Sequence, residues 1–211
     1  MTPTPVVCID PGHGTVPAIG RQTEPVGPGS STFKIKDGGG APGEAEVALR
    51  IAFRTSSLLK ARGFHVVLTR TAPGYEGGNV ARARFCNAHH AALMLRIHAD
   101  GSTDPARHGF STLYPARRAG WTDDISARSL RAARVVQAAA VRATGAADLG
   151  LVARSDLTGF NWADVPAILV ECGFLSNPAE RARLESAAYE QRVAGGLANG
   201  VRAFLRTSSS R

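Results

Sequence analysis

Val6-Val7-Cys8-Ile9-Asp10-Pro11-Gly12-His13-Gly14 is the stretch that decides the fold, because its short apolar run stops abruptly at a tight loop. Strands that are buried on both faces of a sheet are continuous apolar runs, and Pro and Gly force the chain out of such a strand. We therefore predict a buried strand that presents His13 at its carboxyl end. In open α/β sheets, ligands and reactive groups lie at this edge.

Two later stretches have the same form. Residues 93–101 (LMLRIHADG) are an apolar run that delivers His98, and residues 167–173 (AILVECG) are a run that delivers Glu171. The carboxyl ends of parallel strands meet at one edge of a sheet. The three runs therefore predict that two histidines and one glutamate come together at that edge.

Length and composition predict one domain that spans residues 1–211. The chain has 211 residues, of which 44% are hydrophobic, and its 23 Gly and 12 Pro are spread rather than clustered. At this size roughly 70% of the unfolded surface can be buried. Strands that alternate with helices predict a three-layer α/β fold, in which helices cover both faces of a mostly parallel sheet. Residues 207–211 are expected to form a frayed tail.

The formal net charge of +8 has two interpretations. It reflects either a solvated, arginine-rich surface or an attraction to an anionic polymer. We expect no nucleic acid partner, because the chain has no nucleic-acid motif and only 6% aromatic residues for base stacking. An acidic cell wall fits the charge equally well. No window approaches the roughly 18 uninterrupted apolar residues that a membrane span needs.

A helix is predicted over residues 44–62, and its periodicity separates two carboxylates. Apolar residues follow Glu44 at helical spacing and place it on the buried face: Val47, Ile51 and Leu58. Glu46 shares a face with two arginines instead, so we expect it in solvent, where it can pair with Arg50. Glu44 is thus an acid at the start of a helix that points at the core. One interpretation is a first-turn carboxylate that interacts with the helix dipole, and the other is a metal ligand.

Residues 15–42 form a long segment rich in Gly and Pro. Within it, residues 32–37 alternate between polar and apolar and predict one arm of a small hairpin. Because the segment directly follows His13, it is interpreted either as a rim of the site or as a flexible insertion.

The second half of the chain adds three predictions. A strand is predicted over residues 109–114, with an edge of the sheet as one option, and a loop over residues 150–164. Asn177 followed by Pro178 predicts the start of a short helix.

The three cysteines, Cys8, Cys86 and Cys172, are expected to be unpaired. Two lie in predicted core strands and one in a predicted helix, which favours buried small hydrophobic residues over a disulfide framework. Their number and spacing also match no zinc–cysteine motif.

His13, His98 and the inward-facing Glu44 supply two nitrogens and one oxygen. This set is typical of a catalytic zinc with an open fourth position, which holds a water whose pKa falls to about 7. Glu171 is a costly residue to bury without a purpose or a partner. It is interpreted as the general base that moves a proton from this water to the leaving amine, or as a core residue paired with Arg70 or Arg82.

These residues resemble those of a known family, the zinc-dependent N-acetylmuramoyl-L-alanine amidases of the amidase-3 type. Such enzymes cut the amide between muramic acid and the first alanine of peptidoglycan stem peptides. The resemblance runs from about Val6 to Leu205. It is carried by Ile9-Asp10-Pro11-Gly12-His13-Gly14, Glu44 at a helix start, Leu68-Thr69-Arg70, Arg82 with Asn87, Ile97-His98-Ala99-Asp100, and residues 170–177 (VECGFLSN).

The resemblance implies a twisted sheet of about six strands and one Zn²⁺ per chain, with Glu171 as the catalytic residue and His13, Glu44 and His98 as the metal ligands. Two positions beside a ligand differ from the family pattern: Arg96 and Asp100 stand where Ser and Asn are common. Five residues are candidates for substrate contacts: Arg70, Arg82, Asn87, Asp100 and Arg154.

Peptidoglycan or a muropeptide is the implied partner, and we expect a monomer. The resemblance implies the cell envelope or the exterior as the location. The chain reaches its first strand by Val6 without a leader, so a trimmed leader, a phage-type lysin and a cytoplasmic protein are alternatives. Two rival functions remain: another zinc peptidase acting on cell-wall peptides, and a non-catalytic amidase-like regulator.

Overall fold

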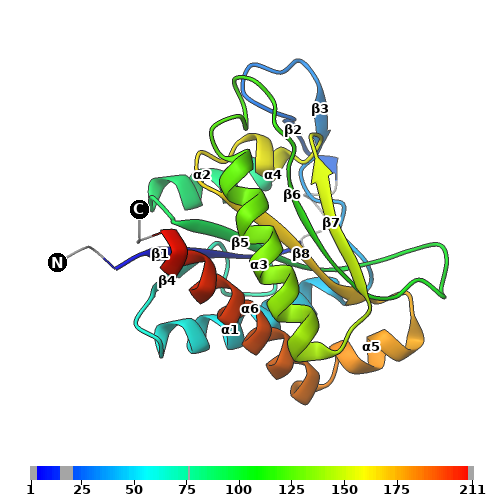
Figure 1. The fold of residues 1–211 in the computed structure, drawn as a ribbon. Helices are drawn as coiled ribbons and strands as arrows, with labels where there is room; N and C mark the ends of the chain where they lie inside the picture. Colours follow the sequence, from blue (N-terminus) through cyan, green and yellow to red (C-terminus); the bar gives the residue numbers. More distant parts are fainter. Residues whose placement is uncertain (1–3, 15–20, 76, 209–211) are drawn as a thin grey trace.

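The computed structural model describes residues 4–14, 21–75 and 77–208, which form a single α/β domain around one six-stranded sheet (Figure 1). The strand order is β4-β1-β5-β8-β6-β7. Neighbours from β4 to β8 pair in parallel, whereas β6 runs antiparallel to β8 and parallel to β7. The predicted fold class, a mostly parallel sheet of about six strands, is confirmed. The strands are β1 (Val6–Pro11), β4 (His65–Leu68), β5 (Leu93–Asp100), β6 (Phe110–Pro115), β7 (Asp148–Arg154) and β8 (Ala167–Phe174).

Two apolar clusters pack on opposite faces of the sheet. Side chains alternate between the faces of a strand, and on β1 this places Val7 and Ile9 in one cluster and Cys8 in the other. The larger cluster lies under the helices α1 (Glu44–Lys60), α3 (Ser126–Thr144) and α6 (Ala187–Ser208). The smaller lies under the shorter helices α2 (Asn79–Ala88) and α4 (Thr158–Asn161), while α5 (Pro178–Leu184) follows β8.

The alternation also places polar residues on one face. Asp10, Arg96 and Glu171 follow Cys8, Met94 and Leu169 by two residues and therefore share the face covered by α2 and α4. His98 lies two residues beyond Arg96 on the same face. These four polar residues therefore lie on the side of the sheet with the thinner helical cover.

Local signals account for the starts of two helices, α1 and α5. Gly43 precedes α1 with a positive φ of 87°, a conformation that favours glycine. The Asn177 side chain accepts hydrogen bonds from the amides of Ala179 and Glu180 and caps α5, with Pro178 at its first position.

The edge prediction for residues 109–114 is wrong, because β6 lies between β8 and β7. The predicted loop over residues 150–164 is also wrong, since it contains part of β7 and all of α4. β7 is the edge strand on this side of the sheet, and its sequence pattern is weak because Gly150 interrupts it and Leu149 and Val152 remain 43% and 40% exposed. A half-exposed edge strand lacks the continuous apolar run that marks a buried one.

Glu46 is exposed as predicted, but the predicted pairing with Arg50 is wrong. Arg50 and Arg54 donate instead to the buried Glu190 on α6, at 2.6 and 3.1 Å. A buried carboxylate gains more from two cations than an exposed one does. This ion pair holds α1 against α6.

The expectation of three free cysteines is wrong for two of them. Cys8 on β1 and Cys86 on α2 form a disulfide, with Cα atoms 5.5 Å apart, and Cys172 is free and buried. The packing of α2 onto the sheet brings these residues into disulfide range, which a linear separation of 78 residues does not reveal.

The hairpin prediction is confirmed: β3 (Phe33–Ile35) pairs antiparallel with β2 (Thr23–Pro25). The first part of that segment, residues 15–20, and the end of the predicted tail, residues 209–211, lie outside the described residues. The helix α6 extends to Ser208, two residues into the predicted tail.

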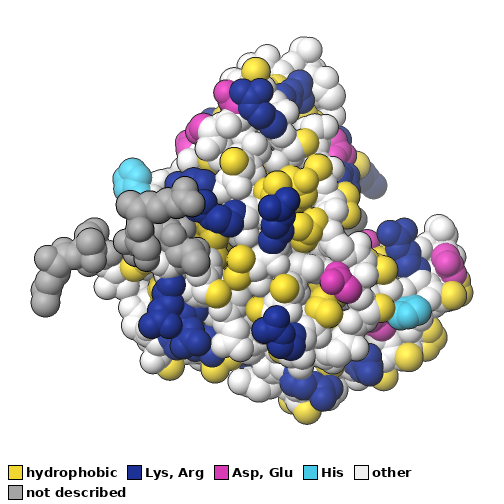
Figure 2. Space-filling model, in the orientation of Figure 1, with side chains coloured by type: hydrophobic (Ala, Val, Ile, Leu, Met, Phe, Trp, Pro, Cys, Tyr) yellow, Lys and Arg dark blue, Asp and Glu magenta, His cyan; other side chains and the backbone are white. Residues whose placement is uncertain are grey.

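Basic side chains are spread over the face formed by α3 and α6 rather than gathered in one patch (Figure 2). None of the helices in the described part of the chain is long and apolar enough to span a membrane.

Candidate functional site

Three side chains from three elements meet at the carboxyl edge of the sheet. His13 follows β1, Glu44 opens α1 and His98 lies near the end of β5. One ligand atom from each lies within 4.8 Å of the others. Glu44 Oε1 lies 3.3 Å from His13 Nε2 and 2.9 Å from His98 Nδ1. The structure thus brings together the three predicted ligands in a cluster that could hold a metal ion.

Two glycines make room for this cluster. A Cβ on Gly12 would lie 2.5 Å from the His98 ring, and a Cβ on Gly40 would lie 2.4 Å from a Glu44 carboxylate oxygen. Gly40 also has a positive φ of 67°. The glycines are therefore required by close approach of the backbone to two of the ligands.

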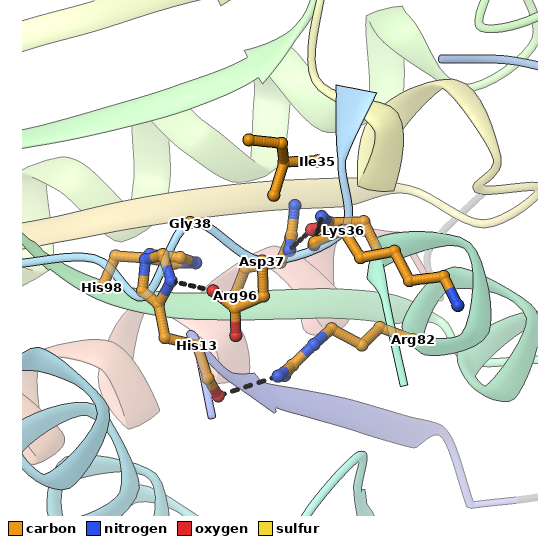
Figure 3. Close-up of a pocket in the computed structure, with 9 residues that line it drawn as sticks. His13, Ile35, Lys36, Asp37, Gly38, Arg82, Arg96 and His98 are labelled. Carbon is orange, nitrogen blue, oxygen red and sulfur yellow. Dashed lines mark hydrogen bonds and ion pairs between the residues drawn. The ribbon is translucent and has the colours of Figure 1, made fainter. Parts of the chain in front are cut away.

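His13 is held by a carboxylate that the sequence did not identify. Asp37, two residues beyond β3, lies with its Oδ1 2.6 Å from His13 Nδ1 (Figure 3). Burial alone would lower the pKa of His13, but the hydrogen bonds with Asp37 and Glu44 raise it to about 9. The bond to Nδ1 leaves Nε2 to face Glu44. The sequence pointed to Asp37 only indirectly, through the interpretation of its segment as a rim of the site.

The contacts of Glu44 are compatible with both of its interpretations. Its Oε2 accepts the Ala41 amide at 2.8 Å, as a first-turn carboxylate does, while Oε1 faces both histidines. Burial would raise the pKa of Glu44, but the hydrogen bonds with His13 and His98 hold it well below its usual range. Burial lowers the pKa of His98, which favours the neutral imidazole that binds metals. His98 Nε2 is buried and has no hydrogen-bond partner among the described residues.

Glu171 lies directly beside His98 in the register of β5 and β8. Its Oε2 is buried, and no hydrogen-bond partner for it exists among the residues that the structure describes. Burial, with the nearby charges of Glu44 and Asp100, raises the pKa of Glu171 well above its usual value. The alternative pairing with Arg70 or Arg82 is not found, because both arginines are engaged elsewhere.

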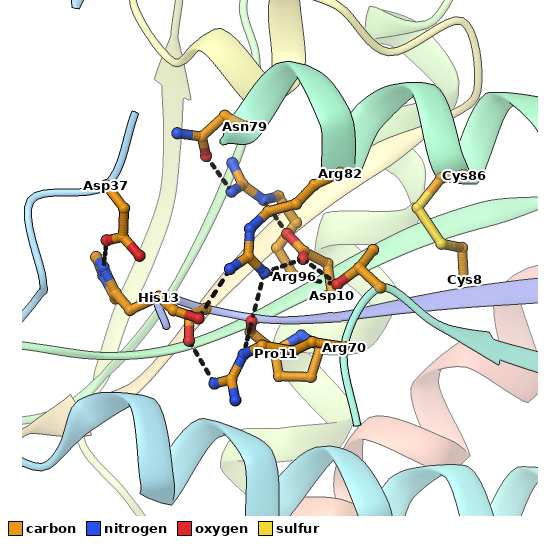
Figure 4. A network of polar contacts seen from close by, with 12 residues as sticks. Cys8, Asp10, Pro11, His13, Asp37, Arg70, Asn79, Arg82, Cys86 and Arg96 are labelled. Carbon is orange, nitrogen blue, oxygen red and sulfur yellow. Dashed lines mark hydrogen bonds and ion pairs between the residues drawn. A yellow bond between two sulfur atoms is a disulfide. The ribbon is translucent and has the colours of Figure 1, made fainter. Parts of the chain in front are cut away.

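A buried ionic network fixes the β1 strand behind the cluster (Figure 4). Asp10 accepts from Arg82 at 2.6 Å and from Arg96 at 2.8 Å. Burial would raise the pKa of Asp10, but Arg82 and Arg96 hold it well below its usual range. Arg82 also donates to the carbonyls of Pro11 and His13. Arg96, the departure from the family pattern, is therefore part of the scaffold.

The remaining candidate residues are distributed between scaffold and cavity. Arg70 is buried and donates to the carbonyls of Pro11 and Gly12, and burial followed by the charge of Arg82 lowers its pKa to about 10. Asn87 binds Trp162 and Asp164 at the far end of α2. Asp100 and Arg154 line a cavity that reaches the cluster.

Two cavities flank the cluster and share His13, His98, Asp100 and Glu171 in their linings. One, of about 480 Å³, is otherwise lined by Glu44 and by small residues of the 38–41 and 101 backbone. The other, of about 390 Å³, has an apolar wall made by Leu113, Val152, Leu157 and Leu169 and a basic rim made by Arg96, Arg107 and Arg154. A chain-like substrate can therefore cross the cluster from one cavity to the other.

The fold and site together define a three-layer α/β domain with a His-Glu-His cluster that could hold a metal ion at the carboxyl edge of its sheet. Comparison with known proteins shows which family within this class the chain belongs to. The N-acetylmuramoyl-L-alanine amidase family model (Amidase_3) matches residues 7–203, and the chain belongs to this family of peptidoglycan amidases.

Individual relatives agree. The chain is 35% identical to the N-acetylmuramoyl-L-alanine amidase Rv3717 of Mycobacterium tuberculosis, over 96% of this chain and 87% of the relative. The crystal structure of the amidase Ami1 from Mycobacterium smegmatis superposes with a TM-score of 0.85, at 28% identity, over 96% of this chain and 97% of Ami1. The catalytic domain of CwlV, an amidase from Bacillus (Paenibacillus) polymyxa var. colistinus, gives a TM-score of 0.74 at 28% identity, over 96% of this chain and 99% of that domain.

Proposed function

We propose that the protein is a zinc-dependent amidase that hydrolyses the bond between N-acetylmuramic acid and L-alanine, with Glu171 as its general base. The observation that carries the proposal is a His-Glu-His cluster beside Glu171, a carboxylate on the neighbouring strand whose Oε2 is buried and has no partner among the described residues. A ligand set of this type suits zinc with an open coordination position.

His13, Glu44 and His98 would hold the ion. Three observations support the fit: the ligand atoms lie within 4.8 Å of one another, His98 Nε2 is buried without a partner, and Gly12 and Gly40 leave no space for larger residues beside the ligands. When bound, zinc supplies a Lewis acid that polarises an amide carbonyl and lowers the pKa of water to about 7.

Glu171 moves the proton. Its carboxylate takes a proton from the water that attacks the carbonyl carbon and passes it to the amide nitrogen as the C–N bond breaks. The raised pKa of Glu171 falls when positive charge is placed at the neighbouring cluster. This favours the carboxylate form, which a general base needs.

Asp37 and the Asp10 network orient the ligands. Asp37 fixes the His13 ring through Nδ1, and such contacts typically set the ring orientation and basicity of a metal-binding histidine. Arg70 and Arg82 hold the backbone of residues 11–13 through its carbonyls. The histidine is therefore positioned before substrate binds.

Metal analysis combined with a muropeptide cleavage assay tests the proposal. The wild-type protein should bind about one zinc per chain, and chelation should abolish cleavage. Glu44→Gln should lose zinc and activity, whereas Glu46→Gln, on the exposed face of the same helical turn, should keep both. A metal-free protein with full activity, or equal zinc loss in the two variants, would contradict the proposal.

Mass spectrometry of the digested muropeptides assigns the bond. Cleavage at the lactyl–alanine amide releases an intact peptide stem that begins with alanine. Products cut between two amino acids would instead favour the rival zinc peptidase. Folded, zinc-loaded protein without any cleavage would favour the non-catalytic regulator.

We further propose that the protein acts in the cell envelope, where its substrate lies. The Cys8–Cys86 disulfide supports this location, because disulfides persist in oxidising compartments.

A further inference from the structure

Three arginines line the cavity between β6, β7 and the cluster, together with an apolar wall and two acids, Asp100 and Glu171. The charge of Arg107 acts on Asp100, but the two side chains form no ion pair. The question is which of these arginines is available to a ligand.

Two of the three already have carboxylate partners. Arg96 is buried and paired with Asp10, at 2.8 Å. Arg154 binds Asp156 through two contacts of 2.7 and 2.8 Å. Arg107 is different: its guanidinium has no carboxylate within ion-pair distance among the described residues. Its contact is the ring of Phe174, whose centroid lies 5.1 Å away. Phe174 is only 1% exposed, so it is a fixed platform under the cation.

The loop that carries Arg107 is held at three points, two by the turn after β8 and one by Glu180 on α5. The Ser102 amide donates to Ser176, and Asn177 donates to the Pro105 carbonyl. The Gly109 amide donates to the buried Glu180, which also accepts the Phe174 amide at 2.7 Å. Side-chain contacts within residues 102–108 tighten the loop further. An exposed arginine on such a loop keeps its position without an ion pair.

We propose that Arg107 determines substrate specificity by binding a free carboxylate of the peptide stem, which lies in the cavity with the apolar wall. The proposal rests on the proposed function, since the scissile bond must sit at the cluster. A carboxylate supplies the charge that Arg107 lacks, and guanidinium matches carboxylate geometry with two parallel hydrogen bonds. The other cavity, lined by Glu44 and small residues, then takes the sugar side.

The test compares two muramoyl tripeptides that differ only in whether the stem carboxylates are free or amidated. Zinc-loaded wild-type protein should cleave the free form with the higher kcat/KM. Arg107→Gln should lower kcat/KM for the free form about tenfold, mainly through KM, and should barely change it for the amidated form. Arg107→Lys should restore part of the preference, because it keeps the charge but loses the planar fork.

Two controls complete the test. Arg142→Gln, an exposed arginine at the end of α3, should leave both rates unchanged, and melting temperatures should show that all variants fold. Calorimetry on metal-free protein should find tighter binding of the free form, and Arg107→Gln should remove that difference.

Equal cleavage of both substrates by the wild type, or an equal loss on both in Arg107→Gln, would overturn the assignment and leave the amidase function intact. Cleavage of neither substrate by folded, zinc-loaded wild type would instead reject the proposed function. In that case the calorimetric comparison still decides whether Arg107 selects a carboxylate.

Discussion

Asp10 on β1 and Glu171 on β8 are acids on the same face of one sheet, yet their surroundings are opposite. Asp10 accepts ion-pair contacts from Arg82 and Arg96, and these outweigh burial and hold its pKa below the usual range. Glu171 has a buried oxygen without a partner among the described residues, and burial raises its pKa well above the usual value.

The difference distinguishes a structural role for Asp10 from a chemical role for Glu171. A fully paired buried charge holds its neighbours in place, whereas a buried acid kept without a partner costs stability and marks a functional group. Asp37 is intermediate, because its Oδ1 binds His13 while its Oδ2 is buried and has no partner among the described residues. In the proposed mechanism, the β1 side therefore fixes the position of the candidate metal ligands, and the β8 side carries the proposed general base.

The largest effect is expected for Asp10→Asn. Removing the charge leaves two buried arginines uncompensated, which typically costs about 3–5 kcal/mol of the free energy of unfolding. Urea unfolding measures this loss. Asp124→Asn, at an exposed position, is the control and should stay within about 0.5 kcal/mol of the parent. If Asp10→Asn lowered the free energy of unfolding only slightly, the structural role assigned to Asp10 would be contradicted.

The second largest effect on stability is expected for the Cys8–Cys86 disulfide, which also involves β1. Replacing Cys8 and Cys86 together by Ala should lower the free energy of unfolding by about 2–4 kcal/mol, because the bridge constrains a long loop of the unfolded chain. Thiol titration of the denatured parent should find one reactive group without reductant and three after reduction. Three groups without reductant would show that the bridge is absent.

Asp37→Asn should weaken zinc binding by about 10- to 100-fold, since it disturbs the contact that orients His13. Competition with a chromophoric chelator measures the affinity. Asp156→Asn, on a partly buried carboxylate that binds Arg154 and Lys34 instead, is the control and should retain the parent affinity. Equal zinc affinities of Asp37→Asn and the parent would show that the Asp37–His13 contact does not contribute to zinc binding.

The smallest effect is a pH dependence of opposite sign for the two acids in metal-free protein. The lowered pKa of Asp10 gives stability that is present above its unfolded value of 3.8 and is lost as the pH falls. The raised pKa of Glu171 gives a penalty that grows as the pH rises above its unfolded value of 4.5. As the pH rises from 5 to 8, the free energy of unfolding of Glu171→Gln should therefore increase relative to that of the parent. A constant difference would contradict the raised pKa.

Much of the site could be predicted from sequence because it lies at the ends of buried strands. Continuous apolar runs located β1, β5 and β8, and helical spacing separated Glu44 from Glu46. These signals are local, and each follows from one element.

The features that were missed depend on tertiary packing. The Cys8–Cys86 bridge and the Arg50–Glu190 pair join elements that are distant in sequence. The edge strand β7 was missed because a half-exposed strand interrupted by glycine has no continuous apolar run. The contact between Asp37 and His13 depends on where residues 33–37 lie relative to β1, which no periodicity specifies.

The most direct test of the account is Glu171→Gln, assayed for zinc content, melting temperature and muropeptide cleavage on the same preparation. The variant should keep the zinc content of the parent and melt no lower, because it removes the charge from a carboxylate whose buried Oε2 has no partner among the described residues. Its cleavage rate should fall by about 10²-fold or more, the scale of losing a positioned general base. A folded, zinc-loaded Glu171→Gln protein with full activity would contradict the account.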